Sequence, residues 1–225
     1  MKNIDLRTQY DNGITQDFAI NQRTQNQTSR EAMYAFVKDE ILNKKVLDLC
    51  CGDGYDAKYY KEKGASVYGI DASKGLINIA KEHYPDIDFK VGFAENLPYE
   101  DSLFDAVLSK YAIMTSADMD PIFEEVYRVL KKGGTFVYLV THPFRQLVER
   151  KDMMQDYFEQ TTVTSNILGG TVKLTEPTHT MNEYFNQDFF SKYELVDFQE
   201  VWDPAAEQIG GGKYPGFFIV KAKKK

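Results

Sequence analysis

The 225-residue sequence is poor in cysteine and histidine, and it contains no long apolar run. Its two cysteines, Cys50 and Cys51, are adjacent, so they cannot close a loop between distant segments as a structural disulfide does. No second Cys or His cluster accompanies them, and the sequence therefore predicts no metal site. No stretch approaches the ~20 apolar residues that cross a bilayer, and the first residues lack the apolar run of a signal peptide. These absences favour a cytoplasmic protein without a membrane partner.

Basic residues are also in the minority, because 27 Lys and Arg stand against 34 Asp and Glu and leave a formal net charge of −7. The resulting field repels polyanions, so nucleic acid is a disfavoured partner unless a local basic patch exists. Hydrophobic residues make up 43% and charged residues 27% of the chain, which excludes a disordered or collagen-like protein. The length suits a single domain with a substantial core.

Apolar runs of strand length alternate with helical patterns through the first two thirds of the chain. The expected strands cover residues 44–50, 66–71, 86–92, 104–110 and 135–141. In the clearest helix Asp120 is the cap and Pro121 the first residue, and we expect Lys131 and Lys132 at its end with Gly133 just beyond it. Strands separated by such helices indicate βαβ units with right-handed crossovers. The sequence therefore predicts an α/β fold, a doubly wound parallel sheet with helices on both faces.

The strongest motif is VLDLCCGDG, followed by a helix and then by YGIDAS. It places a glycine-containing turn at the end of one strand and Asp71 at the end of the next. Because the carboxyl ends of neighbouring parallel strands meet at one edge of a sheet, the turn and the carboxylate should lie close together. Glycine lets the backbone approach a ligand, and a carboxylate can accept two hydrogen bonds from a ribose diol. The pattern indicates a nucleoside cofactor.

Two cofactor classes remain open at this point. Gly52, Gly54 and Ala57 satisfy G-x-G-x-x-A, and Asp71 follows at close to the spacing of an NAD site, so a dehydrogenase is one interpretation. Asp48, two residues before the turn, argues against it because a carboxylate would repel a pyrophosphate at the adjoining helix N-terminus. A carboxylate there suits a ligand with an amino group, such as the methionine end of S-adenosylmethionine.

Residues 28–142 resemble the class I S-adenosylmethionine-dependent methyltransferases, in the group that acts mainly on small molecules. The segments that carry the resemblance are VLDLCCGDG, YGIDAS, GFAENLP, FDAVLSKYAIM and EEVYRVLKKGG. The resemblance implies a Rossmann-like seven-stranded sheet in the order 3-2-1-4-5-7-6, with strand 7 antiparallel. Two strand patterns near the end of the chain, ELVDFQEVW and GFFIVKA, fit the two closing strands.

We expect one domain, residues 1–225, made of four parts. These are an N-terminal lid segment at residues 1–27, a cofactor-binding core at 28–142, a substrate-side insert at 143–178, and a closing helix with two strands at 179–225. Thr180 and Glu183 form a capping box at the start of the closing helix.

The resemblance also implies which residues hold the cofactor. Asp71 would bind the ribose hydroxyls, Gly52 and Gly54 would lie against the methionine portion, and Asp48 would orient its amino end. The full set of implied cofactor-binding residues is Tyr10, Asp48, Cys50, Gly52, Gly54, Asp71, Ala72, Phe93, Ala94, Glu95 and Ser109. The chain departs from the family pattern at two positions. Cys50 replaces the first glycine of the turn, and Phe93 replaces a frequent adenine-binding aspartate, so we expect backbone groups or Glu95 to contact the adenine amino group.

The predicted function is the transfer of a methyl group to oxygen or nitrogen of a small molecule. The methyl group leaves a sulfonium by in-line displacement, and a base within hydrogen-bond reach of the acceptor would assist. His142 at the end of a strand and His179 before the closing helix are the candidate bases. We expect a monomer or homodimer.

Two alternatives from other classes remain. One is a nucleic-acid base methyltransferase acting on RNA, such as tRNA, or on DNA, although SKYA (109–112) lacks the Asn/Asp-Pro-Pro-aromatic motif that such amino-group enzymes often carry after strand four. The other is a nucleotide-binding sensor without catalysis.

Overall fold

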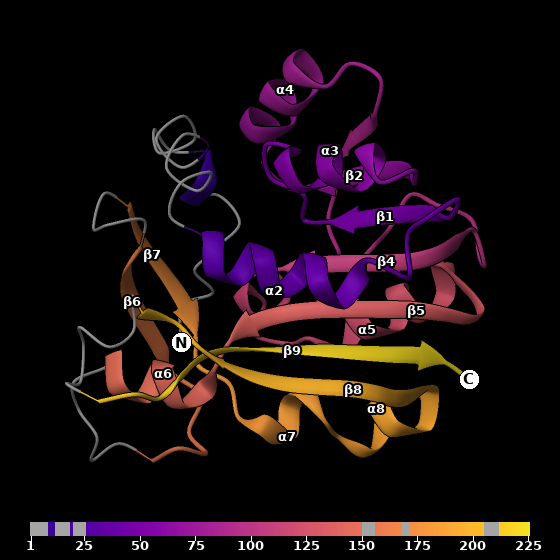
Figure 1. The fold of residues 1–225 in the computed structure, drawn as a ribbon. Coiled ribbons are helices and arrows are strands. Elements are labelled where there is room, and N and C mark those ends of the chain that lie inside the picture. The colour runs from indigo at the N-terminus through magenta and orange to yellow at the C-terminus, as the bar shows by residue number, and fades with distance from the viewer. Residues whose placement is uncertain (1–8, 12–18, 20–25, 150–155, 168–171, 205–211) are drawn as a thin grey trace.

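Seven strands form one mixed sheet within the residues that the computed structural model describes, which are 9–11, 19, 26–149, 156–167, 172–204 and 212–225 (Figure 1). The strands are β1 (Lys45–Leu49), β2 (Ser66–Asp71), β3 (Asp88–Val91), β4 (Phe104–Lys110), β5 (Leu130–Thr141), β8 (Tyr193–Trp202) and β9 (Pro215–Lys224). Their order is β3-β2-β1-β4-β5-β9-β8. The first five are mutually parallel, and β9 is antiparallel to both of its neighbours, β5 and β8. Counted along the chain within this sheet, the order is 3-2-1-4-5-7-6, so the predicted topology is confirmed.

The two faces of the sheet are covered by different helices. The first face carries α2 (Gln27–Val37), α3 (Tyr55–Glu62) and α4 (Lys74–His83), and the second carries α5 (Asp120–Val129), α7 (Met181–Tyr184) and α8 (Gln187–Lys192). Because side chains alternate along a strand, Leu47 and Leu49 join the second core while Val46 joins the first. The same alternation directs Asp48 to the face of α2 and α3. A carboxylate in a buried strand is thus set beside those two helices.

The structure corrects both ends of the helix that was expected to have its cap at Asp120. Asp120 is the first helical residue, and Met119 is the N-cap. Helix α5 ends at Val129, and Lys131, Lys132 and Gly133 belong to the first part of β5. Leu130 pairs with Phe104 of β4, and the register then shifts before Thr135 pairs with Ala106. Gly133 adopts φ +72° within this irregular part of the strand. The glycine therefore marks a strand irregularity, which has the same sequence signature as a helix end.

The predicted insert contains α6 (Pro143–Glu149) and an antiparallel hairpin of β6 (Thr162–Ile167) and β7 (Val172–Pro177). In Figure 1 the hairpin stands beyond the carboxyl ends of β1 and β4, outside the main sheet. The predicted capping box of the closing helix is present, because the Thr180 and Glu183 side chains each bond the other residue's backbone. Most of the predicted lid segment lies outside the described residues. No helix in the described ranges is long and apolar enough to cross a membrane.

Gly69 in β2 provides a test of how closely this strand packs against the Phe89 ring. A Cβ at this position would lie 2.4 Å from a ring carbon of Phe89, which is only 2% exposed, and 3.0 Å from Cys51 Sγ. We expect Gly69→Ala to lower the free energy of unfolding by about 1–3 kcal/mol, because the enclosed ring must shift. Urea unfolding measures the change. Gly212→Ala is the control, since a Cβ there meets no atom within 4 Å; equal losses in both variants would contradict the packing argument.

Candidate functional site

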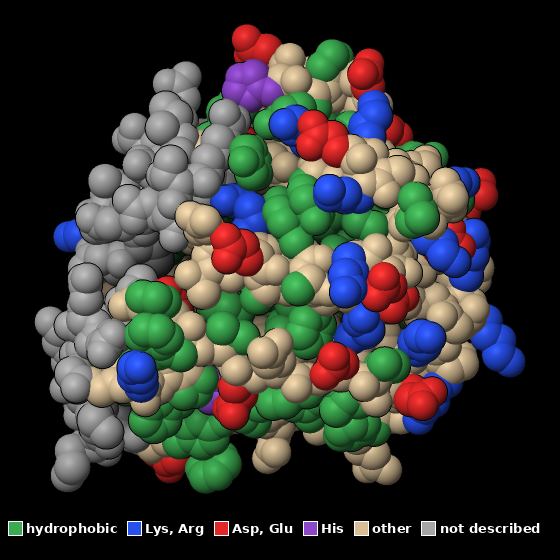
Figure 2. Space-filling view, viewed as in Figure 1, with side chains coloured by type: hydrophobic (Ala, Val, Ile, Leu, Met, Phe, Trp, Pro, Cys, Tyr) green, Lys and Arg blue, Asp and Glu red, His purple; other side chains and the backbone are tan. Residues whose placement is uncertain are grey.

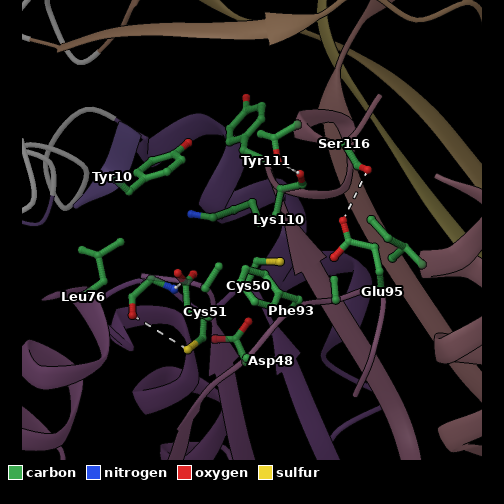
Figure 3. Close-up of a pocket in the computed structure, with 18 of the residues that line it drawn as sticks. Tyr10, Asp48, Cys50, Cys51, Leu76, Phe93, Glu95, Lys110, Tyr111 and Ser116 are labelled. Carbon is green, nitrogen blue, oxygen red and sulfur yellow. Dashed lines mark hydrogen bonds between the residues drawn. The ribbon is translucent and has the colours of Figure 1, made fainter. Parts of the chain in front are cut away.

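A cavity of about 400 Å³ opens at the carboxyl ends of β1, β2 and β4 (Figure 3). The predicted cofactor-binding residues that line it are Tyr10, Asp48, Cys50, Gly52, Asp71, Ala72, Phe93, Ala94 and Glu95. Gly54 and Ser109 are not among the lining residues. The cavity lies where strand order reverses between β1, β2 and β4, which is the usual ligand position in an open α/β sheet.

Asp71 joins the two loops that form one side of the cavity. Its carboxylate accepts hydrogen bonds from Gly52 N–H at 2.9 Å and from Ser73 N–H at 2.8 Å. Burial raises the pKa of Asp71, while these two N–H donors act in the opposite direction. Each carboxylate oxygen has one such bond, which leaves acceptor capacity on both for hydroxyl groups of a ligand.

The turn after β1 is built on left-handed backbone. Cys50, Gly52 and Gly54 have φ of 58°, 55° and 78°. Cys50 therefore takes, in this turn, the left-handed conformation that glycine adopts more easily. Gly54 has a packing role, because a Cβ there would lie 2.6 Å from Phe89 Cζ.

Asp48 is a buried carboxylate with an unsatisfied oxygen. The residue is 5% exposed, and its Oδ2 has no hydrogen-bond partner in the described structure. Burial raises its pKa well above the ordinary value; the charge of Asp56 adds to this and that of Lys110 opposes it. A buried carboxylate without a partner is costly, and a ligand with a positive charge or N–H donors would lower that cost.

Lys110 and Asp56 line the same cavity, and neither was predicted from the sequence as a site residue. Lys110 Nζ lies 2.7 Å from Asp56 Oδ2, and the other Asp56 oxygen accepts from Arg30 Nε at 2.9 Å and Tyr34 Oη at 2.7 Å. Although burial alone would raise it, the charges of Lys110 and Arg30 hold the pKa of Asp56 at about 2. One sequence signal could have identified Lys110. It is a charged residue at the end of an apolar strand, which is also the position of Asp71.

Phe93, Ala94 and Glu95 form the wall after β3. Phe93 is 45% exposed although it is aromatic, and it presents its ring at the cavity. Glu95 accepts a hydrogen bond from Ser116 Oγ at 3.4 Å, which links this wall to the loop after β4. An exposed aromatic ring beside a carboxylate suits a flat heterocycle with an amino group.

Residues 9–11 are attached to two other elements, and one of them, Tyr10, lines the cavity. The Gln9 amide donates to Thr175 O at 2.9 Å and accepts from Thr175 N–H at 3.0 Å, so it pairs with the edge of β7. Asp11 accepts from Ser73 Oγ and from Gly75 N–H at the start of α4. Tyr10, between the two anchors, lines the cavity, and Figure 3 shows it above Lys110 and Asp48 in that view.

The two candidate bases do not line the cavity. His142 Nε2 lies 2.8 Å from Glu200 Oε1, and its Nδ1 accepts from Phe144 N–H at the start of α6. His179 Nε2 lies 3.0 Å from Met114 O, and its Nδ1 lies 3.3 Å from Glu183 Oε1. Each ring thus has a structural use that holds the insert or the closing helix. A general-base role for either histidine stays a prediction.

A further buried carboxyl, Glu176 on β7, lies on the insert side. It is 7% exposed and accepts from Gln146 Nε2 at 2.9 Å. Burial raises its pKa to about 7. The same Gln146 side chain accepts from His179 N–H at 3.1 Å, so the carboxyl belongs to the polar network that joins the insert to the closing helix.

A model of the family described as methyltransferase domain matches residues 47–138. Among solved structures, an S-adenosylmethionine-dependent methyltransferase described as putative, from Listeria monocytogenes, is 26% identical, with a TM-score of 0.70 over 87% of this chain and 99% of that chain. An uncharacterized methyltransferase of Synechocystis is 42% identical over 44% of this chain and 48% of that protein. A demethylmenaquinone methyltransferase of Paenarthrobacter aurescens is 37% identical over 47% of this chain and 42% of that protein. The chain thus spans about half the length of the curated relatives it matches or less, and the predicted resemblance is confirmed.

The left-handed backbone of Cys50 predicts a stability difference between two variants. Both Cys50→Ala and Cys50→Gly remove the thiol, but alanine keeps a Cβ at φ 58° and glycine does not. We expect the glycine variant to be more stable than the alanine variant by about 1 kcal/mol, because a non-glycine residue pays a steric penalty in this region. Chemical denaturation compares the two directly, and an alanine variant that is at least as stable would refute the strain.

The raised pKa of Glu176 predicts that stability depends on pH. The folded value of about 7 lies above the ordinary 4.5, so the native state binds more protons than the unfolded state between these limits. Stability from this group is complete below pH 4.5 and is lost as the pH rises through about 7. We expect Glu176→Gln to gain about 2–3 kcal/mol relative to the wild type between pH 5 and pH 8. Glu62→Gln, at a side chain 58% exposed, is the control and should show no such trend.

Proposed function

We propose that this chain, which carries a class I S-adenosylmethionine-dependent methyltransferase domain, transfers a methyl group from S-adenosylmethionine to a small molecule. The observation that carries the proposal is the unpartnered oxygen of Asp48 in the same cavity as the Asp71 carboxylate. One oxygen of Asp48 has no hydrogen-bond partner among the described residues, and the Asp71 carboxylate is held with acceptor capacity left on both oxygens. A ligand with an ammonium at one end and a ribose at the other matches both.

The residues present fit this cofactor along its length. Asp48 would accept from the ammonium of the methionine portion, and Asp71 would accept from the ribose hydroxyls. Phe93 would pack on adenine, with Glu95 beside its amino group. Cys50 and Gly52 would lie along the chain between ammonium and ribose, where the left-handed turn brings backbone close to the cavity.

When bound, S-adenosylmethionine supplies an electrophilic methyl group on a sulfonium. The residues of this chain then have two tasks, to hold the acceptor in line with that methyl group and to keep water away. Tyr10 and Tyr111, both on the cavity wall, are placed to cover an acceptor. The carboxylates of the cavity also suit a cofactor whose overall charge is positive.

For the acceptor, we propose a small aromatic molecule. Tyr10, Tyr111 and Ile122 are among the lining residues and offer two aromatic rings and one aliphatic side chain to an acceptor. The sequence prediction of oxygen or nitrogen as the methylated atom remains part of the proposal. Carbon is a second candidate, because one curated relative, 31% identical over 49% of this chain, is a ubiquinone/menaquinone biosynthesis C-methyltransferase of Campylobacter jejuni. Figure 2 shows Lys and Arg interspersed with Asp and Glu on the visible face, which favours a small molecule over a nucleic acid.

Substitution of the two carboxylates tests the cofactor site. We expect Asp71→Asn to weaken binding of S-adenosylhomocysteine by about 10–100-fold, because charge-assisted hydrogen bonds are lost. Asp48→Asn should also weaken binding by about tenfold while leaving the free energy of unfolding unchanged or higher, since an unpartnered buried charge is removed. Calorimetric titration and urea unfolding give the two readings.

Asp86→Asn is the matched control, because its side chain is 86% exposed and lies away from the cavity. It should change neither reading. A wild type that does not bind S-adenosylhomocysteine would refute the cofactor, and full affinity in both site variants would refute the assigned positions.

A further inference from the structure

The cavity wall is rich in carboxylates but contains a single basic side chain among the described lining residues. The acidic members are Asp48, Asp56, Asp71, Glu95 and Asp118. The basic one is Lys110 at the end of β4. The proposed cofactor has a carboxylate of its own in its methionine portion, and that group would be repelled by most of this wall. A cation would offset this repulsion, and among the described lining residues Lys110 is the one that carries a positive charge.

Lys110 is placed on the same side of the sheet as Asp48. Asp48 pairs in register with Leu108, and Lys110 follows Leu108 by two residues, so both side chains point to the face of α2 and α3. In Figure 3 the Lys110 amine extends into the space between Tyr10 and Leu76, above Asp48. A carboxylate and an ammonium thus lie on one face at the ends of adjacent strands.

The hydrogen-bonding capacity of Lys110 is only partly used. Its side chain is 9% exposed, and its charged partner is Asp56, 2.7 Å away. Beyond this ion pair, Nζ has no hydrogen-bond acceptor within the described residues. An ammonium has three donors, so capacity remains for a ligand oxygen.

Asp56 has a second cationic partner besides Lys110. Its Oδ1 accepts from Arg30 Nε and Tyr34 Oη, and Arg30 is itself 6% exposed and lies 4.5 Å above the Tyr55 ring. These partners fix the carboxylate on α3. Lys110 can therefore share its ammonium with a second carboxylate while Asp56 stays paired.

We propose that Lys110 binds the carboxylate of the cofactor's methionine portion and that Asp48 binds the adjacent ammonium. The pair makes a subsite for an α-amino acid zwitterion, and it selects the complete cofactor over related nucleosides that lack the carboxylate. Asp56 acts as a positioning residue that holds the lysine. The inference rests on the proposed function and adds to it the residue that recognises the carboxylate.

The test combines two ligands with three proteins. S-Adenosylhomocysteine and its decarboxylated analogue differ only in the carboxylate and share the ammonium, thioether and nucleoside. Calorimetric titration measures both ligands on the wild type, Lys110→Met and Lys110→Arg. We expect the wild type to prefer the carboxylated ligand by about 10–100-fold, the magnitude of a charge-assisted contact. Lys110→Met should lose this preference, and Lys110→Arg should restore most of it.

The outcomes separate the subsite from the cofactor site. Binding of both ligands with equal affinity by the wild type overturns the role of Lys110 and leaves the proposed function standing. The same fold loss for both ligands in Lys110→Met also overturns it, since a merely structural lysine would affect both. No binding of either ligand by the wild type overturns the subsite together with the proposed function. The wild-type comparison needs no variant and remains decisive if Lys110→Met does not fold, which thermal unfolding would reveal.

Discussion

The carboxylate of Asp71 is the contact on which the cavity depends. By accepting one N–H from the turn after β1 and one from the loop after β2, it ties together the ends of two adjacent strands. Ser73, which provides the second N–H, also caps α4 with its hydroxyl. The turn, the strand end and the helix start therefore form one unit. The cavity has a defined shape on this side because the Asp71 side chain fixes all three.

The fold could be predicted because its signals are local and repeated. Buried parallel strands appear as short apolar runs, and the helices between them have clear starts, so β1, β2 and β4 were found nearly at their observed bounds. The boundary between α5 and β5 could not be found in the same way. Leu130 belongs to the strand because it pairs with Phe104, and that contact joins residues far apart in the sequence.

In the candidate site, too, some residues could be predicted from local sequence, whereas others depend on contacts between distant segments. Asp48 and Asp71 stand at strand ends next to a glycine-containing turn, and this pattern is visible in the sequence. The pairing of Lys110 with Asp56 joins β4 to α3, and only the register of the sheet brings the two together. His142 and His179 were expected at the cavity because of their places in the chain. Their rings are directed by Phe144 N–H and Met114 O, which are contacts that strand position does not reveal.

The Gln9 amide attaches the segment that carries Tyr10 to the β6–β7 hairpin. Its two bonds to Thr175 occupy the backbone edge of β7, and two more bonds from Asp11 attach the neighbouring residue to α4. Outward displacement of the Tyr10 backbone would break contacts on both flanks at once. Movement of a ligand past Tyr10 is therefore coupled to the β6–β7 hairpin and to α4. The residence time of a bound ligand would depend on these anchors as well as on the ligand's own contacts.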